Sequence, residues 1–395
     1  MVKRYPAFDP PEYVDWSADP EVMRQYRQTI EREPARRSRI EQLSADRLLA
    51  LYAGMVRFRL HDIALKRWVR QGVISKAWLG TGEEATTVGP VHALDRGGAE
   101  GDVVGPMIRN AGACHEMGMS VAGMLRGYLG TADSPNRGRD LHIGGREYGV
   151  ITPVSTVGSL AAVIAGLGLA FRLQRSKRLA LTWVGDGATK TGEAHEAFSL
   201  AAVQRLPVIY ILQNNQVALG TPLKDHHAGA GFSDWAGIYG AVGATFDGNH
   251  VLDAYAATVW AVEKCRAGAG PVLLAAETFR MGGHATHDEG EARELFSPET
   301  FAIWGRRDPI GCYETWLVEG AIDLTTGAAV APGSAQESNR SALAAVETAV
   351  TAEVESAAEE ALASRGDMPA GRSAVEGVYG DLPETSHPGP APFYN

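Results

Sequence analysis

The order of apolar and polar positions along the chain predicts an α/β protein. Four short apolar stretches rich in Val, Ile and Leu predict strands at 179–184, 207–213, 243–246 and 271–277. Apolar residues at helical spacing predict helices between them, at 192–205 and 251–266. Regular alternation of strand and helix is typical of a doubly wound parallel sheet.

The residues before this sheet predict further helices. Apolar side chains recur at helical spacing over 44–72, and Ser44 suits the N-cap position. A short helix is expected over 121–129 and a strand over 150–153. The stretch 158–173 is apolar all round, which predicts a buried helix.

The same pattern divides the chain into three parts. Residues 1–43 are polar, charged and dotted with Pro, and they predict an N-terminal arm with a short helix. Residues 44–325 hold the sheet, with long loops at 216–236 and 281–297, where function usually resides. Residues 326–395 predict a polar connection, an Ala- and Glu-rich helix over about 338–364, and a Pro-rich tail.

Composition narrows the class of protein. The 395 residues carry a formal net charge of −10 without a basic block, which argues against nucleic-acid binding. Cys114, Cys265 and Cys312 lie far apart, which predicts neither a disulfide framework nor a zinc site. No apolar run is long enough to span a bilayer, and no signal or transit peptide is evident. We expect a cytoplasmic bacterial or archaeal protein without membrane contact.

The most informative chemistry lies at two strand ends. Gly185, Asp186 and Gly187 follow the strand at 179–184, and Asn215 follows the next strand along the chain. Carboxyl ends of neighbouring parallel strands meet at one edge of a sheet, where such folds bind ligands. One carboxylate and one amide oxygen suit Mg²⁺ shared with phosphate groups. Gly187 would let the backbone approach a phosphate at the positive end of the next helix.

Two other patterns have alternative explanations. Gly166-Leu-Gly168 resembles a dinucleotide-binding pattern, but it lies inside a predicted helix, so we interpret it as helix packing. With no strand followed by a full glycine motif, a nicotinamide oxidoreductase is disfavoured. Asp225, His226 and His227 suggest a metal cluster, although a polar loop above the ligand site is the favoured interpretation.

The segment from Gly185 to Asn215 resembles the thiamine diphosphate-binding motif. Residues 44–320 as a whole are similar to the alpha subunits of the decarboxylating component of 2-oxo acid dehydrogenases. The resemblance implies the thiamine diphosphate-binding fold, with thiamine diphosphate and Mg²⁺ as cofactors. It places the metal ligands at Asp186, the Asn215 side chain and the Val217 carbonyl. It also implies that the turn carrying Gly185, Gly187 and Ala188 binds the diphosphate.

Other segments match the same family. Ile108-Arg109 resembles its diphosphate-binding segment, in which an aromatic residue is usual at the first position. Ser155 and Val157 match residues whose backbone holds the aminopyrimidine ring. His284, in Thr278-Phe-Arg280-Met-Gly-Gly-His284, matches the active-site histidine. Its ordinary pKa suits proton donation near neutrality or stabilisation of an oxyanion as the acyl group moves.

The resemblance also implies partners. Activation of the cofactor needs a Glu on a pyrimidine-binding domain that this chain lacks, which implies a beta subunit and an α₂β₂ heterotetramer. The product would pass to a lipoyl-bearing acyltransferase core.

Ser155 and the pair Glu83-Glu84 favour a branched-chain 2-oxo acid as substrate. Pyruvate and acetoin enzymes remain alternatives. A split transketolase-like subunit and a non-catalytic assembly subunit are also possible.

Overall fold

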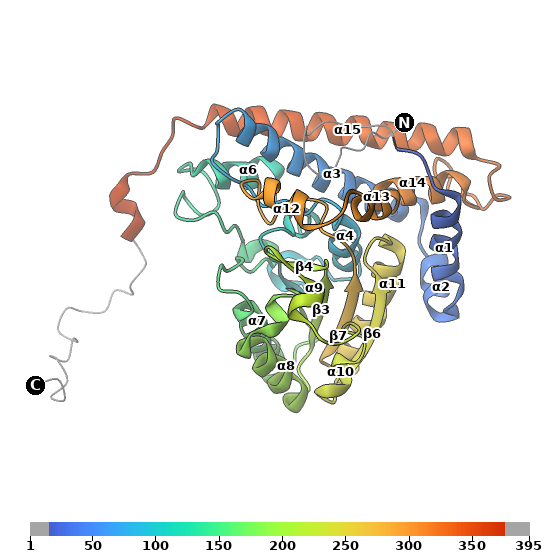
Figure 1. Ribbon diagram of the computed structural model, residues 1–395, viewed down its shortest axis with the longest axis horizontal. Coiled ribbons are helices and arrows are strands. Elements are labelled where there is room, and N and C mark those ends of the chain that lie inside the picture. The colour runs from blue at the N-terminus through green and yellow to red at the C-terminus, as the bar shows by residue number, and fades with distance from the viewer. Residues whose placement is uncertain (1–15, 376–395) are drawn as a thin grey trace, which may run out of the picture.

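The computed structural model describes residues 16–375 and confirms the α/β prediction (Figure 1). The beginning of the predicted arm (1–15) and the end of the predicted tail (376–395) lie outside the described residues. Five parallel strands form the main sheet in the order β1-β2-β3-β7-β6. The strands are β1 (Val103–Gly105), β2 (Ala180–Gly185), β3 (Val208–Asn214), β6 (Val242–Asp247) and β7 (Val272–Glu277), with a separate hairpin of β4 (Val217–Ala218) and β5 (Thr221–Pro222).

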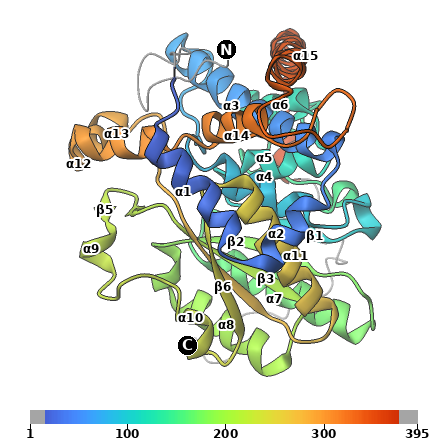
Figure 2. The ribbon, with the colours of Figure 1, turned by 90° about the vertical axis from the view of Figure 1, so that its right-hand side faces the viewer.

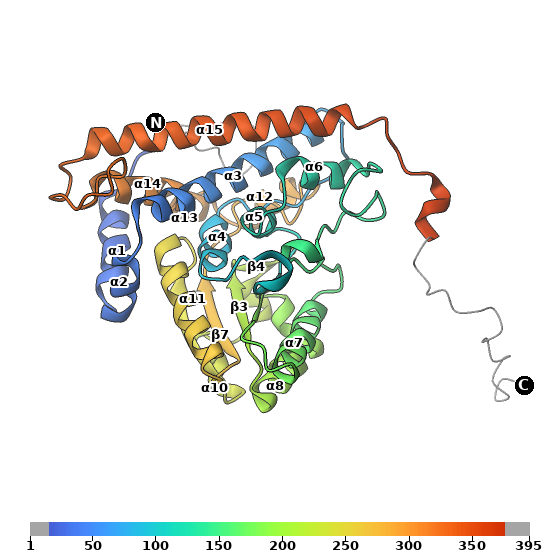
Figure 3. The same ribbon diagram turned by 180° about the vertical axis from the view of Figure 1, so that it is seen from behind.

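Helices surround this sheet on both faces (Figures 1 and 3). Those before β2 are α1 (Pro20–Glu31), α2 (Pro34–Glu41), α3 (Ala45–Arg70), α4 (Glu84–His92), α5 (Ala111–Glu116), α6 (Val121–Leu129) and α7 (Ser159–Leu173). Those after it are α8 (Gly192–Gln204), α9 (Leu223–His226), α10 (Trp235–Ile238), α11 (Val251–Arg266), α12 (Glu289–Leu295), α13 (Pro298–Arg306), α14 (Pro309–Glu319) and α15 (Gln336–Ala363).

Side chains alternate across the strands and build one apolar core on each face. Trp183 and Ile211 belong to the larger core, together with side chains of α3, α4 and α11. Val184 and Tyr210 belong to the second core, together with side chains of α7, α8 and α10. This period of two makes each central strand apolar on both sides, as the near-continuous apolar runs predict.

Long helices cover the edge of the sheet where its strands end. In Figure 1, α15 runs along the top, next to α3 and α6, and contacts between the elements agree. Ion pairs from Arg57 to Glu353 and from Arg126 to Glu360 tie α15 to these two helices. Ser44 caps α3 as predicted, since its hydroxyl accepts the Arg47 N–H at 3.3 Å.

Several predicted elements differ from the structure. Residues 150–153 form no strand; Val150 makes only isolated bridges, to Val104 and Gly145. Helix α7 is not buried all round, because Val163 and Leu173 are 46% and 71% exposed. The arm holds two helices where one was expected, and they pack beside α11 and α14 (Figure 2).

The two predicted long loops contain short elements. The hairpin β4–β5 and the helices α9 and α10 lie within 216–236, apart from the last residues of α10, and α12 lies within 281–297. Over residues 16–375, no helix combines the length and apolar character needed to cross a membrane. Cys114, Cys265 and Cys312 are buried free thiols, so these three form no disulfide, as predicted.

Candidate functional site

The turns after β2 and β3 touch each other at the carboxyl edge of the sheet. Asp186 follows β2, and Asn215 follows β3, whose last paired residues stand opposite those of β2. A Cβ added to Gly187 would lie 2.5 Å from the Cβ of Ala218, so the backbones approach too closely for any side chain at Gly187. Val217 is buried in β4 beside this contact. The structure therefore brings together the residues that the sequence predicts as metal ligands.

Asp186 carries a buried carboxylate oxygen without a hydrogen-bond partner. The side chain is 3% exposed, and its Oδ2 accepts no hydrogen bond. The pKa of Asp186 is raised to about 6, mainly by burial; the Gly187 N–H lowers this pKa, the nearby charge of Glu83 raises it, and Arg280 lowers it. An unpaired buried oxygen of this kind is suited to a divalent cation, because a cation would compensate for the water lost on burial.

The composition of the site decides what kind of metal binding is possible. Across residues 16–375, no group of three or more His, Cys, Asp or Glu side chains has the geometry of a metal site. A cation at Asp186 would therefore need amide and carbonyl oxygens and oxygens from a bound ligand. This is the pattern of Mg²⁺ shared with phosphates rather than of a site made by protein side chains alone.

Two buried guanidinium groups stand at the same edge. Arg109 is 5% exposed and Arg280 is 3% exposed. The pKa of Arg280 is lowered to about 10, first by burial and second by the positive charge of Arg109. An anion placed near both would reduce this repulsion, so the pair fits a diphosphate.

The His284 loop is fixed at both ends, to the residue after β3 and to the segment between α3 and α4. At its start, the Arg280 N–H donates to the Asn215 carbonyl at 3.2 Å. At its end, the Thr286 N–H donates to the Ala77 carbonyl at 2.9 Å, and the Ala77 N–H donates to Thr286 Oγ1 at 3.1 Å. The loop thus holds His284 beside Arg109 instead of leaving it free in solvent.

His284 is a neutral imidazole at pH 7 in this structure. Burial lowers its pKa to about 4, and the charges of Arg109 and Arg280 add to the effect. Arg109 Nη2 lies 3.3 Å from His284 Nδ1, so Nδ1 accepts and the proton resides on Nε2. The expectation of a group that titrates near neutrality therefore differs from the structure, because the sequence shows neither the burial nor the two guanidinium groups.

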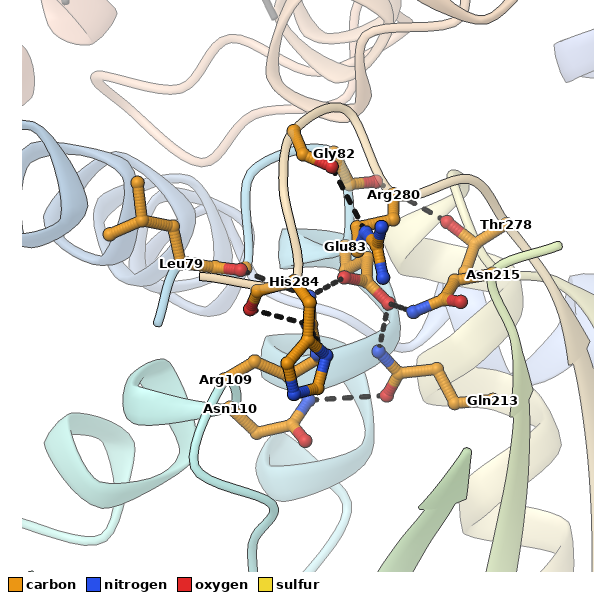
Figure 4. A network of polar contacts seen from close by, with 12 residues as sticks. Leu79, Gly82, Glu83, Arg109, Asn110, Gln213, Asn215, Thr278, Arg280 and His284 are labelled. Atoms are coloured by element: carbon orange, nitrogen blue, oxygen red, sulfur yellow. Dashed lines mark hydrogen bonds and ion pairs between the residues drawn. The ribbon is translucent and has the colours of Figure 1, made fainter. Parts of the chain in front are cut away.

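Glu83 is a central site residue that sequence reasoning missed (Figure 4). Its carboxylate is 0% exposed, and it accepts from Arg109 Nη1 at 3.0 Å, from Asn215 Nδ2 at 2.8 Å and from Gln213 Nε2. Gln213 in turn accepts from Asn110 Nδ2 at 3.2 Å. The available signal was the acidic pair Glu83-Glu84 at the head of a small, apolar helix, which indicates buried carboxylates.

Other predicted residues lie at the rim of the site. Ser155 and Val157 are exposed, and Ser155 Oγ lies 2.9 Å from His142 Nε2. A Cβ on Gly158, directly after them, would collide with Thr191 at the start of α8, so this segment borders the turn after β2. Ile108 is half-buried directly before Arg109.

His226 and Lys190 flank Asp186 from the loop side. His226 Nε2 lies 3.5 Å from Asp186 Oδ2, and neither ring nitrogen of His226 has a hydrogen-bond partner. Lys190 Nζ lies 2.7 Å from His227 Nδ1 and also stands over the ring of Phe232. These contacts agree with a polar loop above the ligand site, the interpretation that the sequence favours.

Comparison with known proteins gives a consistent family. A family model described as "Dehydrogenase E1 component" matches residues 52–365. The 2-oxoisovalerate dehydrogenase alpha subunits of Caenorhabditis elegans and Bacillus subtilis are each 31% identical over 275 residues. These matches cover 69% of this chain, 62% of the nematode protein and 82% of the bacterial one.

The pyruvate dehydrogenase E1 alpha subunit of Rhizobium meliloti is 34% identical over 231 residues, which cover 58% of this chain and 65% of that protein. The chain thus spans less than two thirds of the nematode and Rhizobium proteins. The chain belongs to the dehydrogenase E1 component family and is similar to its alpha subunits.

Proposed function

We propose that this chain is the alpha subunit of a 2-oxo acid dehydrogenase that binds thiamine diphosphate and Mg²⁺ at the carboxyl edge of β2 and β3. The observation that carries the proposal is the buried Oδ2 of Asp186, which accepts no hydrogen bond, at the same edge as the buried cations Arg109 and Arg280. A divalent cation and a diphosphate together satisfy both features. Relatives named as alpha subunits of 2-oxoisovalerate and pyruvate dehydrogenases support the assignment.

Each part of the cofactor has proposed contacts in this chain. Asp186, Asn215 Oδ1 and the Val217 carbonyl would hold Mg²⁺, and Arg109 and the Gly187–Ala188 turn would hold the diphosphate. The backbone of Ser155–Val157 at the rim would hold the ring. When bound, thiamine diphosphate supplies the electron sink that decarboxylation of a 2-oxo acid requires.

His284 has a role as hydrogen-bond donor in this proposal. Its Nδ1 accepts from Arg109, so the neutral ring carries its proton on Nε2, where it can donate a hydrogen bond. A neutral donor stabilises negative charge on a substrate oxygen without having to lose its proton first. We therefore assign His284 to orientation and charge stabilisation of the reacting oxo group and of the lipoyl acceptor.

Exposed apolar side chains on α7 and α8 support a partner subunit. Val163, Leu173, Leu200 and Val203 are between 46% and 76% exposed, and the two helices pack side by side. Exposed apolar surfaces of this kind mark protein interfaces. A beta subunit on this face would also stand near the rim residue Val157, which is 57% exposed. We propose an α₂β₂ assembly that passes its product to a lipoyl-bearing acyltransferase.

The proposed substrate is a branched-chain 2-oxo acid. The 2-oxoisovalerate relatives favour it, while the Rhizobium pyruvate relative and a Bacillus subtilis acetoin oxidoreductase alpha subunit, 31% identical over 254 residues, favour the alternatives. Measurement of kcat/KM for 3-methyl-2-oxobutanoate, pyruvate and acetoin with the purified α–β complex separates them. A higher value for pyruvate or acetoin would refute the branched-chain assignment.

The activity itself is tested with the same complex. Carbon dioxide release from a 2-oxo acid and acyl transfer to a lipoyl domain should both require thiamine diphosphate, Mg²⁺ and the beta subunit. Full activity of this chain alone would refute the need for a partner. Absence of cofactor binding by the α–β complex would refute the proposed function.

A further inference from the structure

Glu83 connects two halves of the candidate site that are far apart in sequence. It lies directly before α4 and is completely buried. Its Oε2 accepts from Arg109 Nη1 at 3.0 Å, and its Oε1 accepts from Asn215 Nδ2 at 2.8 Å (Figure 4). One carboxylate thus binds both the proposed diphosphate ligand and a proposed metal ligand.

The contact with Asn215 fixes which end of the amide faces the metal. An amide has a donor end and an acceptor end, whereas a carboxylate accepts only. The nitrogen of Asn215 must therefore face Glu83, which directs Oδ1 to the opposite side. Among residues 16–375, Oδ1 accepts a hydrogen bond only from the Val217 N–H, at a long 3.4 Å, so the oxygen retains capacity to bind a cation. Without Glu83, nothing on that side favours the amide nitrogen over the oxygen.

The contact with Arg109 links Glu83 to the His284 loop as well. Arg109 Nη1 donates to Glu83 and to the Leu79 carbonyl at 3.1 Å. Its Nη2 donates to the His284 carbonyl at 3.1 Å and faces Nδ1 of the ring at 3.3 Å. The orientation of the guanidinium group, set by Glu83, therefore also sets the tautomer of His284.

We propose that Glu83 is a positioning residue that holds the amide of Asn215 with its oxygen towards the metal and fixes the orientation of the Arg109 guanidinium beside His284. The proposal rests on the proposed function, because it assigns how that site is organised. An ion pair that only stabilised the fold would affect metal binding in the same way whatever side chain stood at position 215. The proposal predicts instead that the effect depends on whether residue 215 has an amide nitrogen that can turn towards the metal.

The test compares Glu83→Gln in two backgrounds. In the wild-type background, the Gln amide brings a donor to a place surrounded by N–H donors, so the Asn215 amide loses its orientation. In the Asn215→Asp background, residue 215 has two acceptor oxygens, so either orientation of its side chain places an oxygen towards the metal. Glu83→Gln should therefore weaken metal binding at least about tenfold in the wild-type background, and less than about threefold in the Asn215→Asp background.

The readout is Mn²⁺ binding to the α–β complex with thiamine diphosphate, measured from the electron paramagnetic resonance signal of free Mn²⁺. Glu84→Gln is the matched control: Glu84 is equally buried, but it pairs with Arg59 and accepts the Gly82 N–H at 3.0 Å. It should lower the melting temperature without changing Mn²⁺ affinity. If Glu83→Gln does not fold, Glu83→Asp takes its place in the test. It retains the charge but moves the carboxylate oxygens away from Asn215 and Arg109, so it should lower Mn²⁺ affinity by the same factor of about ten.

The possible outcomes separate the two proposals. If the wild-type complex binds no Mn²⁺ with the cofactor, the proposed function fails. If the wild type binds Mn²⁺ and Glu83→Gln alone retains that affinity, the positioning role is refuted. Equal losses in both backgrounds would also refute it, because they would show a structural role alone.

Discussion

Replacement of His250 by Asn should remove one measurable contribution to the acid sensitivity of this protein. His250 is fully buried at the N-terminus of α11, where its Nδ1 accepts the Asp253 N–H at 3.4 Å. Its Nε2 lies 3.1 Å from the Tyr26 carbonyl and donates to it, and the two rings stack at 3.5 Å. The neutral imidazole thus ties α1 to α11, and protonation would put a donor against the Asp253 N–H.

The size of the effect follows from the pKa. Burial lowers the pKa of His250 from 6.5 to about 4. The unfolded chain therefore takes up a proton before the folded chain does, so stability is full above the unfolded pKa and falls as the pH drops towards 4. The shifted pKa of His250 contributes about 3.4 kcal/mol to the free energy of unfolding at high pH. About 2 kcal/mol of this contribution is lost between about pH 7.5 and about pH 5.

The assay is the free energy of unfolding from urea titrations at these two pH values. Asn keeps the N-cap acceptor but does not titrate. The decrease in the free energy of unfolding between the two pH values should therefore be about 2 kcal/mol smaller in His250→Asn than in the wild type. His61 and His115, whose pKa burial also lowers, contribute equally to both proteins. An identical pH dependence in the variant would refute the reasoning.

Three further predictions concern the site and its surface. Gly187→Ala should weaken thiamine diphosphate binding by roughly tenfold, because its Cβ would lie 2.5 Å from that of Ala218. Gly192→Ala, whose Cβ would enter open space, is the control, and equal affinities of the two variants in calorimetry would contradict the prediction. Val203→Asp should reduce beta-subunit affinity at least about tenfold while its melting temperature stays within about 2 °C, as sedimentation and thermal melts can check, since Val203 is 76% exposed. His284→Ala should slow transfer to a lipoyl domain more than it weakens cofactor binding, and equal effects on both would disprove its assigned role.

Much of the fold could be predicted because its signals are local. The strands β2, β3 and β7 are buried on both sides, so each is a nearly continuous apolar run. In the helices between them, apolar residues recur at helical spacing. Strand β1 was not predicted because Val103–Gly105 is too short to show a pattern; it forms a ladder with β2 and, on its other side, only an isolated bridge. Residues 150–153 look like a strand, but beyond Val150 they form no ladder.

The apolar pattern of α7 misled for a physical reason. A helix that is apolar on all sides must be covered somewhere, but the sequence does not say by which chain. In this chain only one side of α7 is covered, and residues such as Val163 are exposed. The pattern is therefore consistent with burial by a partner.

The candidate site was predictable where strand order determines it. Asp186 and Asn215 lie at the same edge because neighbouring parallel strands end there, a consequence of the βαβ connection itself. Glu83 escaped because its partners Arg109 and Asn215 come from distant segments, and no sequence period connects them. The pKa of His284 escaped for the same reason, since it depends on burial and on Arg109.

The binding of thiamine diphosphate in the presence of Mg²⁺, measured by calorimetry with the α–β complex, tests the central claim most directly. The wild-type complex should bind the cofactor in a Mg²⁺-dependent manner, and Asp186→Asn should weaken that binding at least about a hundredfold, because the buried carboxylate is lost as a metal ligand. Asp225→Asn, which removes the same charge from the exposed loop nearby, should leave the affinity unchanged. Equal, Mg²⁺-dependent affinities of the wild type and Asp186→Asn would contradict the account.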